Sequence, residues 1–101
     1  MVETKPHYIL FYELVEDYVA RRGPLREQHL TLLRAAQQRS EVVLAGALAN
    51  PVDAAVLVFR GPSKDAAEAF AQADPYVKNG LITAWRARAD CGRVAGLVAR
   101  S

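Results

Sequence analysis

The stretch VVLAGALANPVDAAVLVF, residues 42–59, decides the fold of this chain. It is long and apolar enough to suggest a membrane helix, but Asn50 and Pro51 interrupt its middle with residues that favour a turn. Two apolar runs around a short polar turn predict a β-hairpin instead. The predicted strands cover residues 42–49 and 54–60.

On the N-terminal side of the hairpin, the chain predicts one strand and one helix. Residues 7–15 (HYILFYELV) are rich in β-branched and aromatic side chains, which favour a strand. Residues 16–22 are polar and predict only a short helical turn. Good helix formers fill residues 25–39, and Pro24 is well placed at the start of that helix.

On the C-terminal side, the chain predicts a second helix and a last strand. Ser63 is a candidate N-cap, and apolar residues recur at helical spacing over residues 64–73. The helix ends at Asp74, because a residue before proline avoids the α region. A final strand is predicted over residues 81–89, and the tail over residues 91–101 has no clear pattern.

The element order β-α-β-β-α-β predicts a single α+β, ferredoxin-like domain over residues 1–101, with a four-stranded antiparallel sheet and two helices on one face. Both hairpin strands, however, are apolar on both alternating sets of side chains. A sheet with helices on a single face normally carries polar residues on the other. We therefore expect a second copy of the chain to cover the free face, giving a homodimer joined through its sheets.

The composition is that of an ordinary globular protein. Of the 101 residues, 51% are hydrophobic and 24% are charged, and the formal net charge is +2. These values exclude intrinsic disorder and disfavour nucleic acid or a membrane surface as a partner. The strand AAVLVF also lacks the basic-glycine-aromatic pattern of an RNA-recognition strand. Cys91 is the single cysteine and MVETKPHY contains no apolar signal region, so we expect a cytoplasmic protein without an internal disulfide.

His29 is the candidate catalytic residue in the helix over residues 25–39. At about 100° per residue, Leu25, Leu32, Leu33 and Ala36 lie within about 60° of His29, so its imidazole is expected to face the sheet. An inward histidine loses hydration and needs a hydrogen-bond partner. Arg26 lies one turn earlier, at the flank of the same stripe. Helix position alone favours the simpler interpretation of a core-edge histidine bonded to backbone groups.

Asp74 is the second candidate, because a carboxylate is unfavourable at the negative C-terminal end of a helix. Turn initiation before Pro75 is one explanation. The functional explanation is that both helices lie on one face of the sheet, where Asp74 reaches His29. The carboxylate would then fix the imidazole tautomer and raise the basicity of the other ring nitrogen.

Three further residues are candidates for substrate binding. Gly46, inside an apolar strand, indicates a bulge, a close approach to a ligand or a simple packing need. Tyr76 either lines the cleft and donates its hydroxyl or packs over a helix end. Arg86, with Arg88 on the same strand face, either binds an anionic substrate or lies at an interface edge. The histidine and acid spacing carries no metal-site signature.

Four short motifs over residues 8–89 resemble the YCII-related domain family: REQHL (26–30), AGAL (45–48), DPY (74–76) and GL (80–81). The resemblance implies a dimeric ferredoxin-like α/β barrel with an active site built on a histidine–aspartate pair. That pair maps to His29 and Asp74, with Arg26 beside them. The family includes a chlorohydroxyquinol dehydrochlorinase, which implies elimination chemistry. This chain has Ala47 where the family often has proline.

Two functions from different classes are consistent with these residues. In the first, an enzyme without a redox cofactor acts on a small anionic or carbonyl-bearing molecule by elimination or isomerisation. His29 is the general base, Asp74 orients it, and Arg26 stabilises developing negative charge. In the alternative, the chain is a non-catalytic dimeric ligand-binding or accessory module, and His29 is a hydrogen-bonding residue of the pocket wall.

Overall fold

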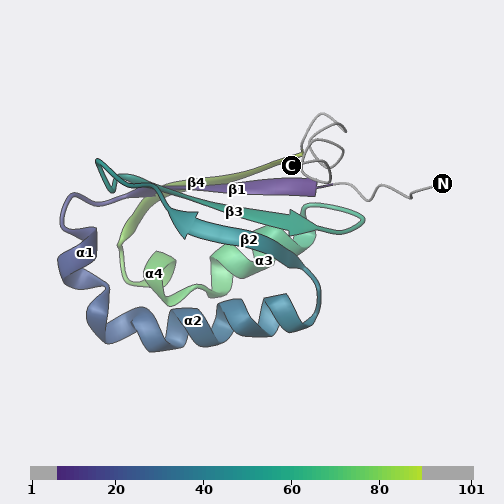
Figure 1. The fold of residues 1–101 in the computed structure, drawn as a ribbon, viewed down its shortest axis with the longest axis horizontal. Coiled ribbons are helices and arrows are strands. Elements are labelled where there is room, and N and C mark those ends of the chain that lie inside the picture. The colour runs from purple at the N-terminus through teal and green to yellow at the C-terminus, as the bar shows by residue number, and fades with distance from the viewer. Residues whose placement is uncertain (1–6, 90–101) are drawn as a thin grey trace.

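The computed structural model describes residues 7–89 as one four-stranded antiparallel sheet with four helices on one of its faces (Figure 1). The strand order is β2-β3-β1-β4, so the first and third strands of the chain form the centre of the sheet. This arrangement confirms the predicted ferredoxin-like α+β fold. The strands are β1 (His7–Leu14), β2 (Val42–Ala47), β3 (Ala54–Arg60) and β4 (Ile82–Ala89), and the helices are α1 (Tyr18–Arg21), α2 (Gly23–Gln38), α3 (Asp65–Ala73) and α4 (Pro75–Lys78).

The two main helices differ from the prediction at their ends, and the short helix α4 was not predicted. Helix α2 begins at Gly23 rather than at residue 25, with Pro24 in its first turn. Helix α3 begins at Asp65, since Lys64 holds the N-cap position, while Ser63 Oγ accepts a hydrogen bond from the Asp65 N–H at 3.2 Å. None of the helices in residues 7–89 combines the length and the apolar character that crossing a membrane requires.

The β2–β3 hairpin is present, but it is shorter and less regular than predicted. Strand β2 ends at Ala47 rather than at residue 49, and Asn50 adopts a left-handed φ of 55° in the turn. The pairing register shifts between Val42 and Leu44, which marks a bulge. The bulge buries Val42 and leaves Leu44 on the face away from the helices, 67% exposed.

The hydrophobic core lies between the sheet and the helices, and strand alternation decides which side chains enter it. Small alanines on α2 and α3 let these helices pack closely against the larger side chains of the sheet. The buried residues of the central strands are Leu10, Tyr12 and Leu14 on β1 and Ala55, Leu57 and Phe59 on β3. The buried residues of α2 and α3 are Ala36, Ala67, Phe70 and Ala71.

The opposite face of the sheet, which we call the open face, also carries apolar side chains. Ile9 and Phe11 on β1 and Val56 and Val58 on β3 alternate with the core residues and are half-buried. No described helix packs on this face (Figure 1). The homodimer expected to cover it stays a prediction.

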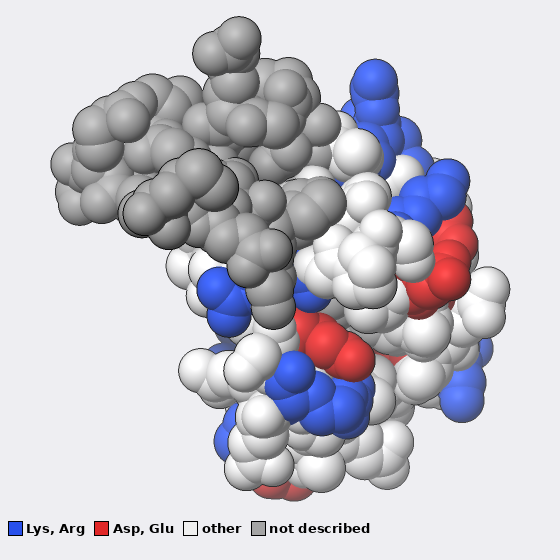
Figure 2. Space-filling view, turned by 90° about the vertical axis from the view of Figure 1, so that its right-hand side faces the viewer, with Lys and Arg blue, Asp and Glu red and all other residues white. Residues whose placement is uncertain are grey.

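Charged side chains of both signs are mixed on the described part of the surface in Figure 2. Lysine and arginine lie beside aspartate and glutamate there, without a broad field of one sign. This agrees with the formal net charge of +2.

Candidate active site

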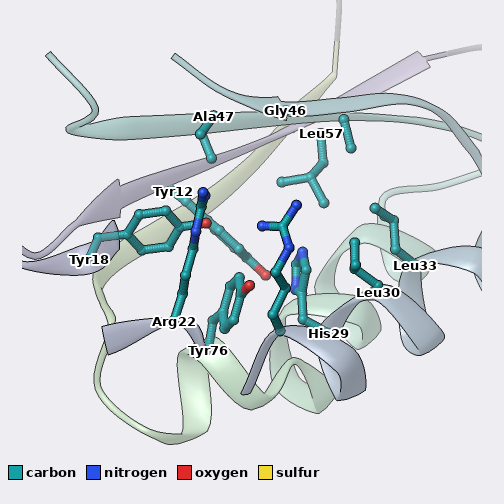
Figure 3. Close-up of a pocket in the computed structure, with 13 residues that line it drawn as sticks. Tyr12, Tyr18, Arg22, His29, Leu30, Leu33, Gly46, Ala47, Leu57 and Tyr76 are labelled. Carbon is teal, nitrogen blue, oxygen red and sulfur yellow. The ribbon is translucent and has the colours of Figure 1, made fainter. Parts of the chain in front are cut away.

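A pocket of about 200 Å³ opens between the sheet and the N-terminal half of α2 (Figure 3). Its helical side is formed by α1, α2 and α4, and its sheet side by small residues of β2 and β3 together with Tyr12 of β1 and Leu57 of β3. Phenol, imidazole and guanidinium groups are its polar groups, and no carboxylate is among the described side chains that line it. The lining residues are Tyr12, Tyr18, Arg22, Arg26, His29, Leu30, Leu33, Ala45, Gly46, Ala47, Ala55, Leu57 and Tyr76.

His29 projects from α2 into this pocket and is held by aromatic neighbours. Its ring stacks on Tyr76 with centroids 4.0 Å apart and planes 9° from parallel, and it meets the edge of Phe70 at 6.2 Å. The side chain is 14% exposed, so the imidazole is largely removed from water while one edge still reaches the pocket. The predicted inward orientation is observed, but the polar partner is not a backbone group.

Asp74 is that partner, and its position follows from local chain geometry. It ends α3 and at the same time caps α4, its carboxylate accepting a hydrogen bond from the Tyr76 N–H at 3.0 Å. An N-cap aspartate followed by Pro75 in the first turn is a standard helix start. The expectation of a carboxylate at an unfavourable helix end is therefore corrected: at the N-terminus of α4 the negative charge is stabilised.

The Asp74 carboxylate is fully buried and has three donors. Oδ1 lies 2.9 Å from His29 Nδ1 and also accepts from the Tyr76 N–H, while Oδ2 accepts from the Tyr12 hydroxyl at 2.7 Å. Burial of a charge is costly unless it is hydrogen-bonded, and these donors supply the required partners. We call this group, formed by Tyr12, Asp74 and the Nδ1 edge of His29, the inner end of the pocket.

Tyr12 supports the carboxylate as a neutral donor. Burial raises the pKa of Tyr12 far above its ordinary value of 10.0, and the charge of Asp74 and the hydrogen bond to it raise it further. The phenol therefore keeps its proton throughout the ordinary pH range. It holds Oδ2 in place while Oδ1 faces the imidazole.

The hydrogen bond to Asp74 also defines the imidazole tautomer. An ionised carboxylate only accepts hydrogen bonds, so Nδ1 is the donor in this pair. In the neutral ring Nε2 then carries a lone pair. Because Nδ1 is bound to Asp74, the nitrogen that remains for a ligand of this pocket is Nε2 (Figure 3).

The other polar part of the pocket, which we call the basic end, consists of Arg22, Arg26 and the Tyr76 hydroxyl. Arg22 lies over the Tyr18 ring, with 5.4 Å from its guanidinium carbon to the ring centroid. Arg26 is exposed on α2. Burial raises the pKa of Tyr76, while the two guanidiniums act in the opposite direction.

Gly46 lines the pocket through its backbone, and Arg86 does not reach it. Gly46 pairs with Val56 of the open face, and a Cβ added to it would meet nothing within 4 Å, so no packing need explains this glycine. The bulge of β2 lies earlier in the strand. Arg86 sits on the open face, with its guanidinium carbon 4.8 Å from the Phe11 centroid and its Nη1 4.0 Å from Glu13 Oε2. The sheet separates Arg86 from His29.

Among the polar side chains that line the pocket, the sequence analysis missed Tyr12, Tyr18 and Arg22. Tyr12 could have been predicted from the sequence, because it lies on the same strand face as Leu10 and Leu14. A phenol buried on that face needs a hydrogen-bond partner. Arg22 and Tyr18 gave no such signal, since their positions depend on how α1 folds back on the start of α2.

Comparisons with known proteins agree with this fold. A family model described as the YCII-related domain matches residues 7–88. A solved structure, the 5-chloro-2-hydroxyhydroquinone dehydrochlorinase of Burkholderia phenoliruptrix AC1100 in complex with 2,5-dihydroxybenzoquinone, is similar with a TM-score of 0.67. The two chains are 17% identical, and the similarity covers 81% of this chain and 90% of that one. No curated protein matched the sequence.

Proposed function

The chain belongs to the YCII-related domain family, and we propose that it is a small-molecule enzyme that uses His29 and Asp74 for acid–base chemistry. The reaction class is elimination with loss of a halide, or the related isomerisation of a ring-bound carbonyl. The observation that carries the proposal is the 2.9 Å contact between His29 Nδ1 and the fully buried Asp74 carboxylate at the wall of a pocket.

The roles of the two residues follow from this contact. Asp74 orients the ring and stabilises the imidazolium that forms when Nε2 takes a proton. Because Tyr12 and the Tyr76 N–H hold the carboxylate, it keeps its position as the imidazole changes charge. Arg26 stabilises negative charge that develops on a substrate oxygen, and Tyr76 and the Gly46 backbone contribute to the binding surface.

Loss of HCl from a chlorohydroquinone illustrates the proposed chemistry. In the keto tautomer the carbon that bears chlorine is tetrahedral. Nε2 of His29 removes a hydroxyl proton, the electron pair moves through the conjugated system, and chloride leaves with its bonding pair. A quinone remains, and the net change is the loss of HCl. The reaction therefore needs no oxidant or reductant.

Turnover of 5-chloro-2-hydroxyhydroquinone under argon tests the proposal, because the structural neighbour is named for this reaction. Chloride release and quinone absorbance are the readouts. We expect acceleration over buffer and a loss of about 10²- to 10⁴-fold in His29→Gln, the usual contribution of a general base. His7→Gln, on β1 and outside the pocket lining, is the matched control and retains the rate. An equal rate in His29→Gln and wild type contradicts the proposal, and binding without chloride release favours the non-catalytic binding module.

The proposal includes a homodimer formed through the open face, with Arg86 at the interface rather than at the substrate. Apolar side chains on both faces of β3 support it. Replacing Leu44, which is 67% exposed, by glutamate is expected to shift the molar mass in solution from dimer to monomer. Val19→Glu, at an exposed apolar residue of α1, is the control and leaves the mass unchanged.

A further inference from the structure

The two guanidiniums of the basic end have no acidic partner in the part of the chain that the structure describes. Within residues 7–89, neither Arg22 nor Arg26 forms an ion pair, although acids lie close to them in the chain. Those acids are engaged with other arginines: Asp17 with Arg21 at 3.6 Å and Glu27 with Arg34 at 3.3 Å. Two like charges four residues apart repel, so this pair costs stability where it stands.

The Tyr76 hydroxyl is a second group without a partner at the same place. The residue is 1% exposed, and its hydroxyl oxygen is buried without a hydrogen bond to any described group. Its ring is fixed between the stacked His29 and the edge of Tyr18, whose centroid is 5.6 Å away. A buried hydroxyl that forms no hydrogen bond is unfavourable, which points to an acceptor that a ligand brings.

The shape of the pocket suits a flat molecule. Phenol and imidazole rings form its helical wall, and Ala45, Ala47 and Ala55 leave room on the sheet side (Figure 3). Arg22 extends from the helical side toward Ala47, held by its contact with the Tyr18 ring (Figure 3). The volume of about 200 Å³ exceeds the roughly 150 Å³ of an engineered cavity that admits benzene, so one substituted six-membered ring fits.

We propose that the basic end recognises a planar organic anion, with Arg22 and Arg26 pairing to its ionised oxygens and the Tyr76 hydroxyl donating to the same edge. Guanidinium groups bind such oxygens in a fork geometry, which also orients the ring. The opposite edge of the ring then faces His29 Nε2. The inference rests on the proposed function, since it names the substrate class of that site, but anion binding itself requires no proton transfer.

The Tyr76 hydroxyl is screened from solvent, so the anion reaches it only when a neighbouring side chain moves. Arg26 is the exposed member of the basic end, so its side chain is free to move. Arg22 is half-buried against Tyr18. Arg22 is thus expected to act as the fixed contact and Arg26 as the closing one. Replacing Arg26 should therefore raise the rate of ligand release more than replacing Arg22.

Calorimetric titration with 2,5-dihydroxybenzoquinone tests the inference, because its hydroxyls are vinylogous carboxylic acids that ionise at neutral pH. The uncharged 2,5-dimethoxybenzoquinone is the matched ligand. We expect the anion to bind and the neutral ring to bind about tenfold or more weakly. Arg22→Gln and Arg26→Gln each weaken anion binding by about tenfold, and Tyr76→Phe weakens it by up to about tenfold. Arg39→Gln, at the far end of α2 and paired with Glu41, leaves it unchanged.

The outcomes separate this inference from the proposed function. Equal affinity for both quinones, or wild-type affinity in Arg22→Gln and Arg26→Gln, overturns the inference even where chloride is released. Arginine-dependent anion binding that is retained in His29→Gln supports the inference even where no chloride is released. Stopped-flow release rates that rise more in Arg22→Gln than in Arg26→Gln contradict the assigned roles of the two arginines.

Discussion

The polar groups at the inner end of the pocket are hydrogen-bonded to one another, whereas those at the basic end lack such partners within residues 7–89. At the inner end, one buried carboxylate has three donors, and each hydrogen bond is 3.0 Å or shorter. At the basic end, Arg22 and Arg26 form no ion pair and the Tyr76 hydroxyl forms no hydrogen bond within residues 7–89. His29 stacked on Tyr76 joins the two ends.

At one end of the pocket, folding alone supplies the polar contacts, whereas at the other end a bound ligand would have to supply them. The inner end is satisfied by the chain itself, so it contributes to stability and fixes the imidazole before any substrate arrives. The basic end carries unpaired charge that costs stability and is offset only by a bound anion. Substitutions at the inner end should therefore affect folding, and substitutions at the basic end should affect binding.

The largest stability effect is expected for Asp74→Ala. It leaves the Tyr12 hydroxyl and the Tyr76 N–H without an acceptor, and we expect a loss of about 3 kcal/mol or more in the free energy of unfolding. Urea denaturation measures this loss. The control is Asp65→Ala, which removes an exposed carboxylate from the first turn of α3 and should cost less than about 1 kcal/mol. Similar losses in both variants would mean that the inner end does not stabilise the fold.

Tyr12→Phe should have the next largest effect. It removes one hydrogen bond to a buried charged group, which typically costs about 1.5–3 kcal/mol at neutral pH. Tyr8→Phe on the same strand is the control, because its hydroxyl makes only an exposed 3.4 Å contact with the Pro62 carbonyl. A loss in Tyr8→Phe as large as that in Tyr12→Phe would contradict the assigned difference.

The pH dependence of stability should distinguish the same two variants. The pKa of Tyr12 is raised in the folded state, so above the ordinary value of 10.0 the unfolded chain releases a proton that the folded chain keeps. The unfolded chain then binds fewer protons, and stability falls as pH rises, by up to about 1.4 kcal/mol per pH unit for this group. Urea denaturation between neutral pH and pH 11 should show a shallower alkaline decline in Tyr12→Phe than in Tyr8→Phe. A steeper decline in Tyr12→Phe would show that the raised pKa of Tyr12 does not cause the alkaline loss of stability.

At the basic end, the double variant Arg22→Gln/Arg26→Gln should keep or slightly raise stability. Removing two unpaired like charges at i,i+4 spacing relieves a repulsion of about 0.2–0.5 kcal/mol. Thermal unfolding at low and high salt measures the change, which salt should diminish. A clear loss of stability would show that these arginines belong to the fold and would remove the contrast between the two ends.

The smallest effect on the stability of the fold is expected for substitutions on the sheet side of the pocket. Ala47→Leu places a larger side chain in the pocket and should abolish binding of a ring-sized ligand with little change in stability. Gly46→Ala points toward the open face, where a Cβ meets nothing, and should leave binding intact. Loss of binding in Gly46→Ala alone would place a ligand atom, or a second chain, against that position.

The sequence was sufficient to predict the fold and part of each end of the pocket. Alternation and helical spacing predicted the order of the main elements, and the inward stripe of α2 together with Asp74 before Pro75 predicted the contact between His29 and Asp74 at the inner end, without Tyr12. Helix α4 was missed although an aspartate followed by proline also starts a helix. At the basic end, Arg26 and Tyr76 were predicted, whereas Arg22 was not, because it reaches the pocket only through the packing of α1. Arg86 was assigned to the substrate, because strand alternation does not reveal which face of the sheet the helices cover.

The tautomer of His29 tests the central claim most directly, and ¹⁵N NMR of the neutral imidazole side chains measures it. The account predicts a single tautomer for His29, with the proton on Nδ1 and an unprotonated Nε2 whose signal moves when 2,5-dihydroxybenzoquinone is added. Asp74→Asn should disturb the His29 pattern and leave that of His7 unchanged. A His29 ring protonated on Nε2, or a mixture of tautomers like that of free histidine, would contradict the account.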